Sequence, residues 1–264
     1  MADAAPAPVL ADVIKRYTWW RESTGSFDTR RELAATCGVF IVNLGAPLEI
    51  TDARSRTIRL GAGQAFIGGM AQGTSLSRST GAMEGIHVFM PIHELARAMA
   101  VAIGDLADRT VTLDEAIGLE AAELGERILA SNSTAARLDE LDAFLTKQMR
   151  AAAEPDTMMA HVMNKLRSAN VSATAEGLGW SRKRLAAWFR DHTGIRPAQF
   201  SRLCRFESFT GALQCEPHAS LAELAYGAGY VDQAHLTHDV RRLTGIIPAA
   251  LRTLLLPARG GVRS

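Results

Sequence analysis

The chain has 264 residues, 47% of them hydrophobic, and a net charge of only +1. This length exceeds the usual size of one domain, so two domains are expected. No run of about 18 apolar residues and no basic, apolar leader around Asp3 is present, so neither a membrane span nor secretion is predicted. Cys37, Cys204 and Cys215 form no CxxC pair; they are interpreted as small hydrophobic residues in a reducing cytoplasm, with redox sensing as the alternative.

The small net charge hides a split along the chain. Residues 156–264 carry 14 Lys and Arg against 8 Asp and Glu, a net charge of +6, whereas residues 1–155 carry 15 against 20, a net charge of −5. A basic footprint is typical of nucleic-acid binding. The C-terminal part is therefore the candidate for contact with DNA.

The pattern of residues 39–90 is one of short strands separated by turns. Strands are expected at VFIVNLG, LEI, TIRL, AFIGGM and GIHVFM, and turns at TDARSR and STGAME. Such regular short strands predict a small β-barrel or sandwich, here interpreted as a cupin-like domain. Helices should follow from Pro91 and over residues 113–130 and 135–152, because apolar residues recur there at helical spacing.

Polar and aromatic residues of this first part could belong to a site. His87, His93 and Glu94 could hold a metal in a cupin-like barrel, but no H-x-H pair or second carboxylate joins them. They are interpreted as ordinary side chains, and no metal, other cofactor or catalytic residue is predicted. Trp19 and Trp20 either line a ligand pocket or pack in the core, and packing is the commoner outcome.

The segment AAAEPDT around Pro155 marks the expected boundary between two domains. Residues 1–152 are assigned to a sensor or dimerisation domain, 153–156 to a linker, 157–257 to a second domain and 258–264 to a tail. Strand signals stop after the boundary, because glycines and prolines divide the rest into short helical segments. Seven helices are expected, at 157–168, 172–178, 181–191, 197–213, 220–227, 231–243 and 248–256.

Two segments of the second part repeat one arrangement. They are ATAEGLGWSRKRLAAWFRDHTGIRP and LAELAYGAGYVDQAHLTHDVRRLTGIIP, and each has a short helix, a glycine turn and a longer helix that ends in Thr-Gly before a proline. The matched glycines and prolines are Gly179 with Gly229, Gly194 with Gly245, and Pro197 with Pro248. A helix-turn-helix needs this order of elements, because its second helix presents a polar face to the major groove.

The longer helix of each repeat is expected to bury one apolar stripe. Ser181 is a good N-cap for the first of these helices. Residues spaced by three or four positions share a face of a helix, which defines the stripes. The predicted buried residues are Leu185, Trp188 and Phe189 in the first repeat, and Leu236, Val240 and Leu243 in the second.

The motifs of both repeats resemble those of the AraC/XylS family of transcription regulators. The pattern S-x-x-x-L-x-x-x-F-x-x-x-x-G-x-x-P-x-x-F begins at Ser181 and ends at Phe200, and G-Y-V-D-Q-A-H-L followed by R-R-L-T-G-x-x-P resembles the second unit of that family. The resemblance spans about 100 residues. It implies an α+β two-domain protein whose C-terminal domain is an all-α, seven-helix double helix-turn-helix domain.

The resemblance also implies which residues contact DNA. By position, base contacts fall on Arg182, Lys183, Ala186, Ala187, Gln233, Ala234, Thr237 and His238. Alanines offer no hydrogen bond and can meet only a thymine methyl group, whereas Gln233 can bind adenine with two hydrogen bonds. Asp239 is an acidic residue at a position where a basic residue facing the groove is expected. Phosphate contacts are predicted for Arg184, Arg190, Arg196, Arg202, Arg241 and Arg242.

The resulting hypothesis is a cytoplasmic, one-component regulator that binds double-stranded promoter DNA. Its further expected partners are a small-molecule effector, RNA polymerase and a second copy of the chain, and no membrane is involved. Two alternatives stay open. One is an enzyme that accepts alkyl groups on Cys37 and is targeted by the helix-turn-helix units. The other is an interaction module without base readout.

Overall fold

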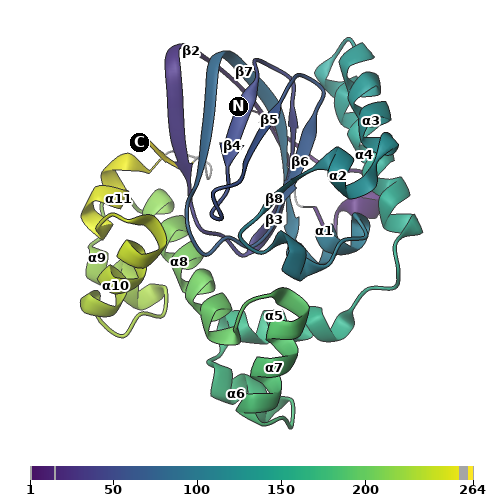
Figure 1. Ribbon diagram of the computed structural model, residues 1–264. Coiled ribbons are helices and arrows are strands. Elements are labelled where there is room, and N and C mark those ends of the chain that lie inside the picture. Colours follow the sequence, from purple (N-terminus) through teal and green to yellow (C-terminus); the bar gives the residue numbers. More distant parts are fainter. Residues whose placement is uncertain (1, 15, 256–260, 264) are drawn as a thin grey trace. The chain divides into compact units, whose positions relative to one another are not determined.

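The computed structural model describes residues 2–14, 16–255 and 261–263 and is shown in Figure 1. Residues cluster into two compact units. Unit 1 comprises Met1–Thr29, Cys37–Met70 and Ser77–Asp156, and unit 2 comprises Arg30–Thr36, Ala71–Leu76 and Thr157–Ser264.

Unit 1 is built on an antiparallel sheet, with helices along one side (Figure 1). Its main strand order is β1-β2-β7-β3-β6-β8, and β4 pairs with β5 and β7. The predicted β-rich region is confirmed. The strands are β1 Ala2–Ala4, β2 Tyr17–Glu32, β3 Cys37–Asn43, β4 Leu48–Thr51, β5 Thr57–Leu60, β6 Ala65–Gly68, β7 Ser75–Pro91 and β8 Thr110–Thr112.

Apolar side chains pack against both faces of β3. Val39 and Ile41 pack against a cluster of residues from β4, β5 and β6. Phe40 points to the other face, where its ring meets that of Phe144 in a helix, with 6.1 Å between the ring centroids. Alternation of side chains along a strand therefore divides the core of unit 1 into two layers.

The helices of unit 1 differ from expectation at one glycine. The single helix expected over 113–130 is two helices, because Gly118 has a φ of +65° and breaks the helical path. The helices are η1 Pro8–Leu10, α1 Ile92–Ala98, η2 Ile103–Leu106, α2 Leu113–Ile117, α3 Leu119–Ala130 and α4 Thr134–Ala151, where η denotes a 3₁₀ helix.

Two strand predictions were incomplete. The segment STGAME, expected to be a turn, lies inside β7, which continues through Gly81 at a φ of +87°. The long strand β2 was not predicted at all. Its sequence YTWWRESTGSFDTRRE is rich in charged and hydroxyl side chains, so the alternation of apolar and polar residues that marks a half-buried strand is absent.

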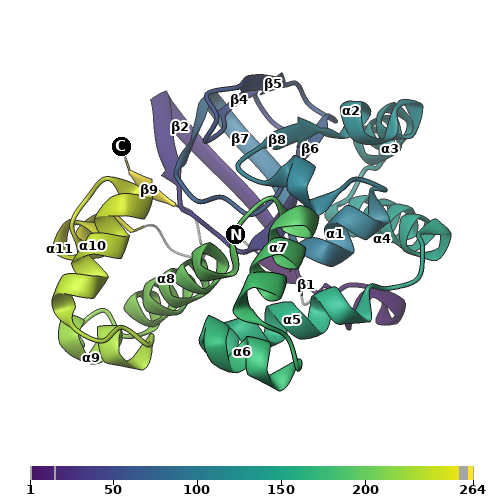
Figure 2. The ribbon, with the colours of Figure 1, turned by 60° about the horizontal axis from the view of Figure 1, so that its bottom comes forward.

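Unit 2 has the seven predicted helices, with ends that agree within two residues over the described part of the chain. In Figure 2, α8 runs between a first lobe, α5–α7, and a second lobe, α9–α11. No helix that the structure describes has the length and hydropathy needed to cross a membrane. The helices are α5 Thr157–Ser168, α6 Val171–Gly177, α7 Arg182–Thr193, α8 Pro197–Cys215, α9 Leu221–Gly227, α10 Gln233–Thr244 and α11 Pro248–Leu254.

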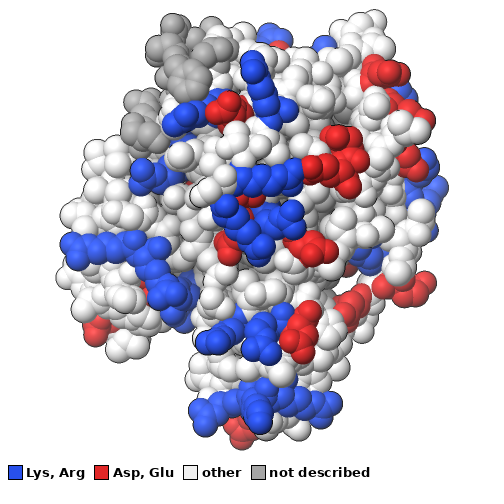
Figure 3. Space-filling view, viewed as in Figure 1, with Lys and Arg blue, Asp and Glu red and all other residues white. Residues whose placement is uncertain are grey.

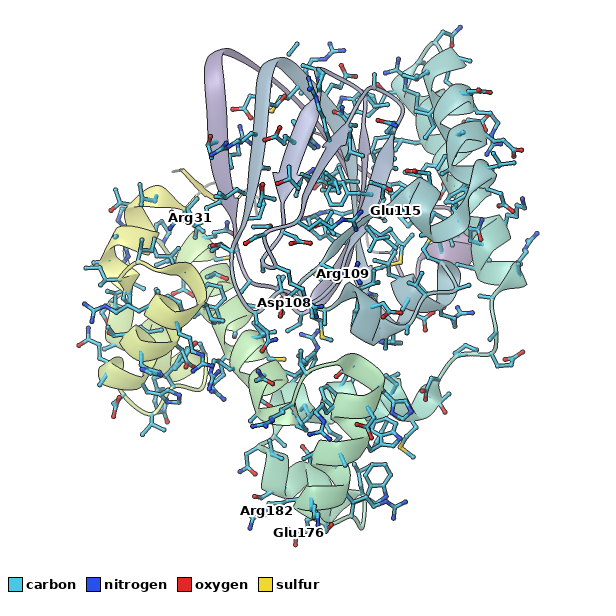
Figure 4. The ribbon with its side chains drawn as sticks, viewed as in Figure 1. Arg31, Asp108, Arg109, Glu115, Glu176 and Arg182 are labelled. Atoms are coloured by element: carbon cyan, nitrogen blue, oxygen red, sulfur yellow. The ribbon has the colours of Figure 1, made fainter. Side chains whose placement is uncertain are left out.

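The C-terminal end holds one strand where a tail was expected. Val262–Arg263 forms β9, which pairs antiparallel with Arg30 and Arg31 of the same unit. Arg31, labelled in Figure 4, also donates a hydrogen bond of 3.1 Å to the backbone oxygen of Thr244. Residues 256–260 and 264, which include the expected end of the last helix and most of the tail, lie outside the described residues.

Candidate nucleic-acid interface

Both longer helices of the repeats begin at a side-chain cap. Ser181 Oγ accepts a hydrogen bond of 3.1 Å from the backbone nitrogen of Arg184, and Asp232 Oδ1 accepts one of 2.7 Å from that of His235. Such caps satisfy a backbone donor that the first turn of a helix leaves free. The second repeat has one extra residue before its cap, Val231, which is 85% exposed.

Both helices also end in the same way. The Thr193 hydroxyl donates to the backbone oxygen of Phe189 at 2.7 Å, and the Thr244 hydroxyl donates to that of Val240 at 2.7 Å. Gly194 and Gly245 follow with φ of +75° and +77°, the left-handed conformation that ends a helix and favours glycine. The Thr-Gly pair of the sequence motif is therefore the stop signal of both helices.

The predicted apolar stripes are buried with one exception. Leu185 and Phe189 in α7, and Leu236 and Val240 in α10, are fully buried. The expectation for Trp188 was wrong, because this side chain is only half-buried at the edge of the stripe. Phe189 packs against Phe200 of α8, with 5.5 Å between ring centroids, which fixes α7 on the connecting helix.

The outward side of α10 brings together six of the residues predicted to contact DNA. They line one shallow depression on the surface, which contains Gln233, Ala234, Thr237, His238, Arg241 and Arg242. The Thr237 hydroxyl donates to the backbone oxygen of Gln233 at 2.8 Å, so its oxygen remains available as an acceptor. This surface offers an amide, an imidazole and two guanidinium groups to a ligand outside the protein.

The corresponding side of α7 carries cations and alanines. Arg182, Lys183, Ala187 and Arg190 are exposed, and Ala186 is half-buried. Figure 4 places Arg182 at the far end of the first lobe, near Glu176 of α6. In Figure 3, Lys and Arg side chains gather over both lobes of unit 2. The first lobe can attract a polyanion but has few groups with which to read a base edge.

A row of three aromatic rings, Trp180, Trp188 and His192, lies along the flank of α7, and no sequence pattern predicted it. The Arg184 guanidinium lies over the Trp180 ring at 4.5 Å. Trp180 and Trp188 follow at 5.5 Å between ring centroids, and Trp188 and His192 at 4.5 Å. Because a cation over an aromatic face is held there by the ring quadrupole, Arg184 is drawn toward the protein itself.

The placement of Asp239 in the groove was wrong. Its carboxylate is 2% exposed and forms ion pairs with Arg202 at 3.0 Å, Arg205 at 3.5 Å and His235 at 3.6 Å. Asp239 follows the buried Leu236 by three residues, which turns it toward α8. Arg202, predicted to contact phosphate, belongs to this cluster; Arg196 is exposed at the start of α8.

Candidate side chains of unit 1 make contacts of their own. The His87 ring lies 5.3 Å from that of Trp20 and 6.0 Å from that of Phe89. His93 Nε2 is 3.6 Å from a Glu94 carboxylate oxygen. Within residues 2–14, 16–255 and 261–263, no group of three His, Cys, Asp or Glu side chains is arranged to hold a metal ion.

The three cysteines are thiols in different surroundings. Cys37 is half-buried in β3, Cys204 is buried in α8, and Cys215 is exposed at the end of α8. Burial raises the pKa of the Cys204 thiol to about 12. Because the thiolate is the reactive form, Cys204 is unreactive at neutral pH.

We therefore expect the folded chain at pH 8 to be modified by an aromatic disulfide reagent at Cys215 and not at Cys204. Peptide mass spectrometry after timed quenching measures both sites, and a denatured sample should label both. The Cys215→Ala variant serves as the control for the assignment. Equal rates at the two cysteines in the folded chain would contradict the burial of Cys204.

Two repeated helix-turn-helix units, joined by one long helix and presenting basic surfaces, define the class of double helix-turn-helix DNA-binding proteins. The family model of a helix-turn-helix domain matches residues 174–253. This part of the chain is therefore a helix-turn-helix domain, a fold with which many proteins bind DNA. No curated protein matches the sequence.

Solved structures similar to this chain include those of ToxT from Vibrio cholerae. One crystal form of ToxT has a TM-score of 0.53 and 10% sequence identity, covering 90% of this chain and 97% of ToxT. ToxT with a bound unsaturated fatty acid gives 0.54 and 9%, covering 89% and 94%. ToxT with (E)-4-(8-methylnaphthalen-1-yl)but-3-enoic acid gives 0.55 and 9%, covering 91% and 98%. At this identity the similarity shows a shared two-domain fold.

Proposed function

We propose that the chain regulates transcription by reading a specific DNA sequence, chiefly through α10, while α7 anchors the protein to the DNA backbone. This proposal rests on a difference between the equivalent outward surfaces of α10 and α7. Where α10 has Thr237 and His238 in its depression, α7 has Ala186 and Ala187. Side chains that donate and accept hydrogen bonds discriminate base pairs in the major groove, and alanines discriminate them poorly.

Within α10, Gln233 is the proposed principal reader. It is exposed in the first turn of the helix, and the N-terminal residues of a recognition helix are those that reach base edges. Its side-chain NH₂ group can donate to N7 of adenine, and its side-chain oxygen can accept from the N6 amino group of the same base. His238 and Thr237 lie one turn further along and would contact the next base pairs.

The proposed contacts to phosphate come from exposed cations at the rim of both recognition helices. Arg241 and Arg242 supply them for α10 and Arg190 for α7, with Arg196 beside them at the start of α8. Arg182 and Lys183, which the sequence assigns to base contacts, are included here because both are exposed cations on α7. Arg184 and Arg202 are left out of this set, because their guanidinium groups are engaged by Trp180 and Asp239. Phosphate contacts set affinity and register without selecting sequence.

A comparison of two duplexes tests sequence-specific binding. One duplex is selected by the wild-type chain from a random-sequence pool, and the other has the same composition in scrambled order. We expect the selected duplex to bind at least about 10³-fold more tightly near physiological salt, the lower end for specific regulators. Equal affinities for the two duplexes, from folded protein, would reduce the chain to an interaction module without base readout.

Salt dependence tests the phosphate contacts. For Arg241→Gln we expect weaker binding to both duplexes and a slope of log K against log salt that is less steep by about 1, since one phosphate contact releases about one counterion. Fluorescence anisotropy titrations between 50 and 200 mM salt measure the slope. An unchanged slope in Arg241→Gln would remove this residue from the phosphate set.

We also propose that unit 1 responds to a small molecule with an apolar body. Val39 and Ile41 of β3 pair across the sheet with Phe89 and His87 of β7, and all four side chains are half-buried on one face. A partly uncovered apolar face with an imidazole suits an apolar ligand that carries a polar group. The fatty acid and the naphthalenyl acid bound by ToxT have this chemistry.

Oleate is a suitable first probe for that proposal. We expect it to raise the midpoint of thermal unfolding of the wild-type chain, because a ligand that binds only the folded state stabilises it. The Ile41→Arg variant should lose this shift and keep its DNA binding. No shift in the wild-type chain with saturating monomeric oleate, together with unchanged DNA affinity, would contradict the proposal for this class of ligand.

We propose that residues 1–152 mediate self-association, which sedimentation velocity measures, and that the bound regulator contacts RNA polymerase in the cytoplasm, which transcription from a selected site measures. The alternative of an alkyl-accepting enzyme predicts stoichiometric methylation of Cys37 by alkylated DNA. We expect none, because no observation favours an activated thiolate there.

A further inference from the structure

The second lobe contains a buried carboxylate that joins its recognition helix to the connecting helix. Asp239 of α10 is 2% exposed, and its Oδ1 lies 3.0 Å from Arg202 Nε of α8. Its Oδ2 lies 3.5 Å from Arg205 Nη2 of α8 and 3.6 Å from His235 Nε2, one turn earlier in α10. One anion therefore meets cations or potential cations from both helices.

An aromatic wall closes this cluster on one side. The Arg205 guanidinium lies over the Tyr230 ring at 5.6 Å, and the His235 ring meets the same Tyr230 ring edge-on at 5.1 Å. Tyr230 in turn packs edge-on against Phe209 of α8, at 6.4 Å between ring centroids. The Asp239 carboxylate is 2% exposed and so depends on these partners for compensation of its charge, whereas the side chains of Arg202, Arg205 and His235 are 25%, 28% and 35% exposed.

The geometry ties the orientation of α10 to the cluster. Arg202 and Arg205 project from a long helix that packs against both lobes, so they form a fixed reference. A buried carboxylate must stay within reach of these cations, which restricts rotation and sliding of α10 along α8. Gln233, Thr237 and His238 lie on the opposite, solvent-facing side of the same helix, and any such movement would carry them away from the base edges.

The first lobe has no such cluster at the equivalent positions. Counting from the two N-caps, Asp239 corresponds to Trp188 and His235 to Arg184. There the aromatic row of Trp180, Trp188 and His192 replaces the ion pairs. The ion pairs around Asp239 thus occur in the lobe whose surface carries the proposed base-reading side chains.

We propose that Asp239 is a positioning residue for base reading, and that Arg202 acts through Asp239 and does not contact phosphate. This inference rests on the proposed reading of DNA by α10. Asp239 itself never touches DNA; it sets the angle and depth at which Gln233, Thr237 and His238 enter the groove. Loss of the carboxylate should therefore reduce selectivity and leave the general attraction to the DNA backbone in place.

The test uses the full chain with the selected and scrambled duplexes. For Asp239→Asn we expect about tenfold weaker binding to the selected duplex, the size of one base-pair discrimination, and unchanged binding to the scrambled one. Arg202→Gln should show the same pattern with an unchanged salt slope. The double variant should be no weaker than Asp239→Asn alone, because the two residues act as one unit.

Arg241→Gln is the matched control on the same helix, since it should weaken binding to both duplexes and lower the salt slope. An Asp239→Asn variant with the selectivity of the wild-type chain would overturn the positioning role. A salt slope lowered by about 1 in Arg202→Gln would place Arg202 on phosphate and overturn its link to Asp239.

Circular dichroism and thermal unfolding show whether each variant is folded. Should Asp239→Asn lose helix, Arg202→Lys takes its place: it keeps the charge but cannot reproduce the guanidinium geometry, and the same loss of selectivity at constant salt slope is expected. A wild-type chain with no preference between the duplexes would overturn the proposed function itself, whereas a preference that survives in all cluster variants would overturn only this inference.

Discussion

Phe189→Ala is expected to lower the free energy of unfolding of the first lobe by about 3–5 kcal/mol, the usual cost of truncating a buried phenylalanine. Phe189 is fully buried in α7, and its ring packs 5.5 Å from that of Phe200 in α8. The truncation removes apolar contacts and leaves a cavity at the point where α7 meets α8. DNA binding should fall with it, because Arg182, Lys183 and Arg190 lose their fixed arrangement.

Urea unfolding with hydrogen-exchange mass spectrometry of the α7 peptides measures this loss locally. Tyr226→Ala is the matched control, since it truncates an aromatic ring of similar size that is 83% exposed in α9. We expect the control to change stability by less than about 0.5 kcal/mol, as is usual for surface substitutions. A cost below about 1 kcal/mol for Phe189→Ala would contradict the packing of α7 on α8.

Gln233→Ala is expected to remove about 1–3 kcal/mol of discrimination at one base pair, which corresponds to a loss of about 5- to 150-fold in affinity for the selected duplex. Affinity for the scrambled duplex should stay the same, because the glutamine amide carries no charge. The physical reason is that two hydrogen bonds to one base edge disappear and nothing else in α10 changes.

Arg182→Ala provides the comparison, because Arg182 occupies the same position after the N-cap of α7 that Gln233 occupies in α10. It should weaken binding to both duplexes and lower the salt slope by about 1. Equal weakening of both duplexes by Gln233→Ala would mean that α10 grips DNA without reading it.

The helices of unit 2 could be predicted because their ends are encoded locally. Ser181 fixes a start through its side-chain cap, Gly194 fixes a stop through its left-handed conformation, and Pro197 fixes the next start. Gly245 and Pro248 repeat the last two signals. A local signal needs no knowledge of the tertiary structure. The predicted start of α10 also fixes which side chains share its outward face, and the six predicted residues therefore lie together there.

The features that could not be predicted depend on contacts between distant segments. The position of Asp239 was interpreted as facing the groove, because one sequence cannot show that Arg202 and Arg205 of α8 form ion pairs with it. The contacts of Trp180 with Arg184 and with Trp188 are likewise a result of packing. Strand β2 forms by pairing with its neighbours β1 and β7, and its own sequence has no alternation of apolar residues that would predict it.

Base-by-base substitution of the selected duplex, with affinities measured for the wild-type chain, tests the central claim most directly. We predict two blocks of sensitive positions about one helical turn apart, as two recognition helices on one face of DNA require. In one block, each base substitution should cost the wild-type chain about 1–3 kcal/mol of binding free energy, and Gln233→Ala should abolish this sensitivity. Substitutions in the other block should cost less. A flat profile, or a single block unaffected by Gln233→Ala, would contradict sequence reading by α10.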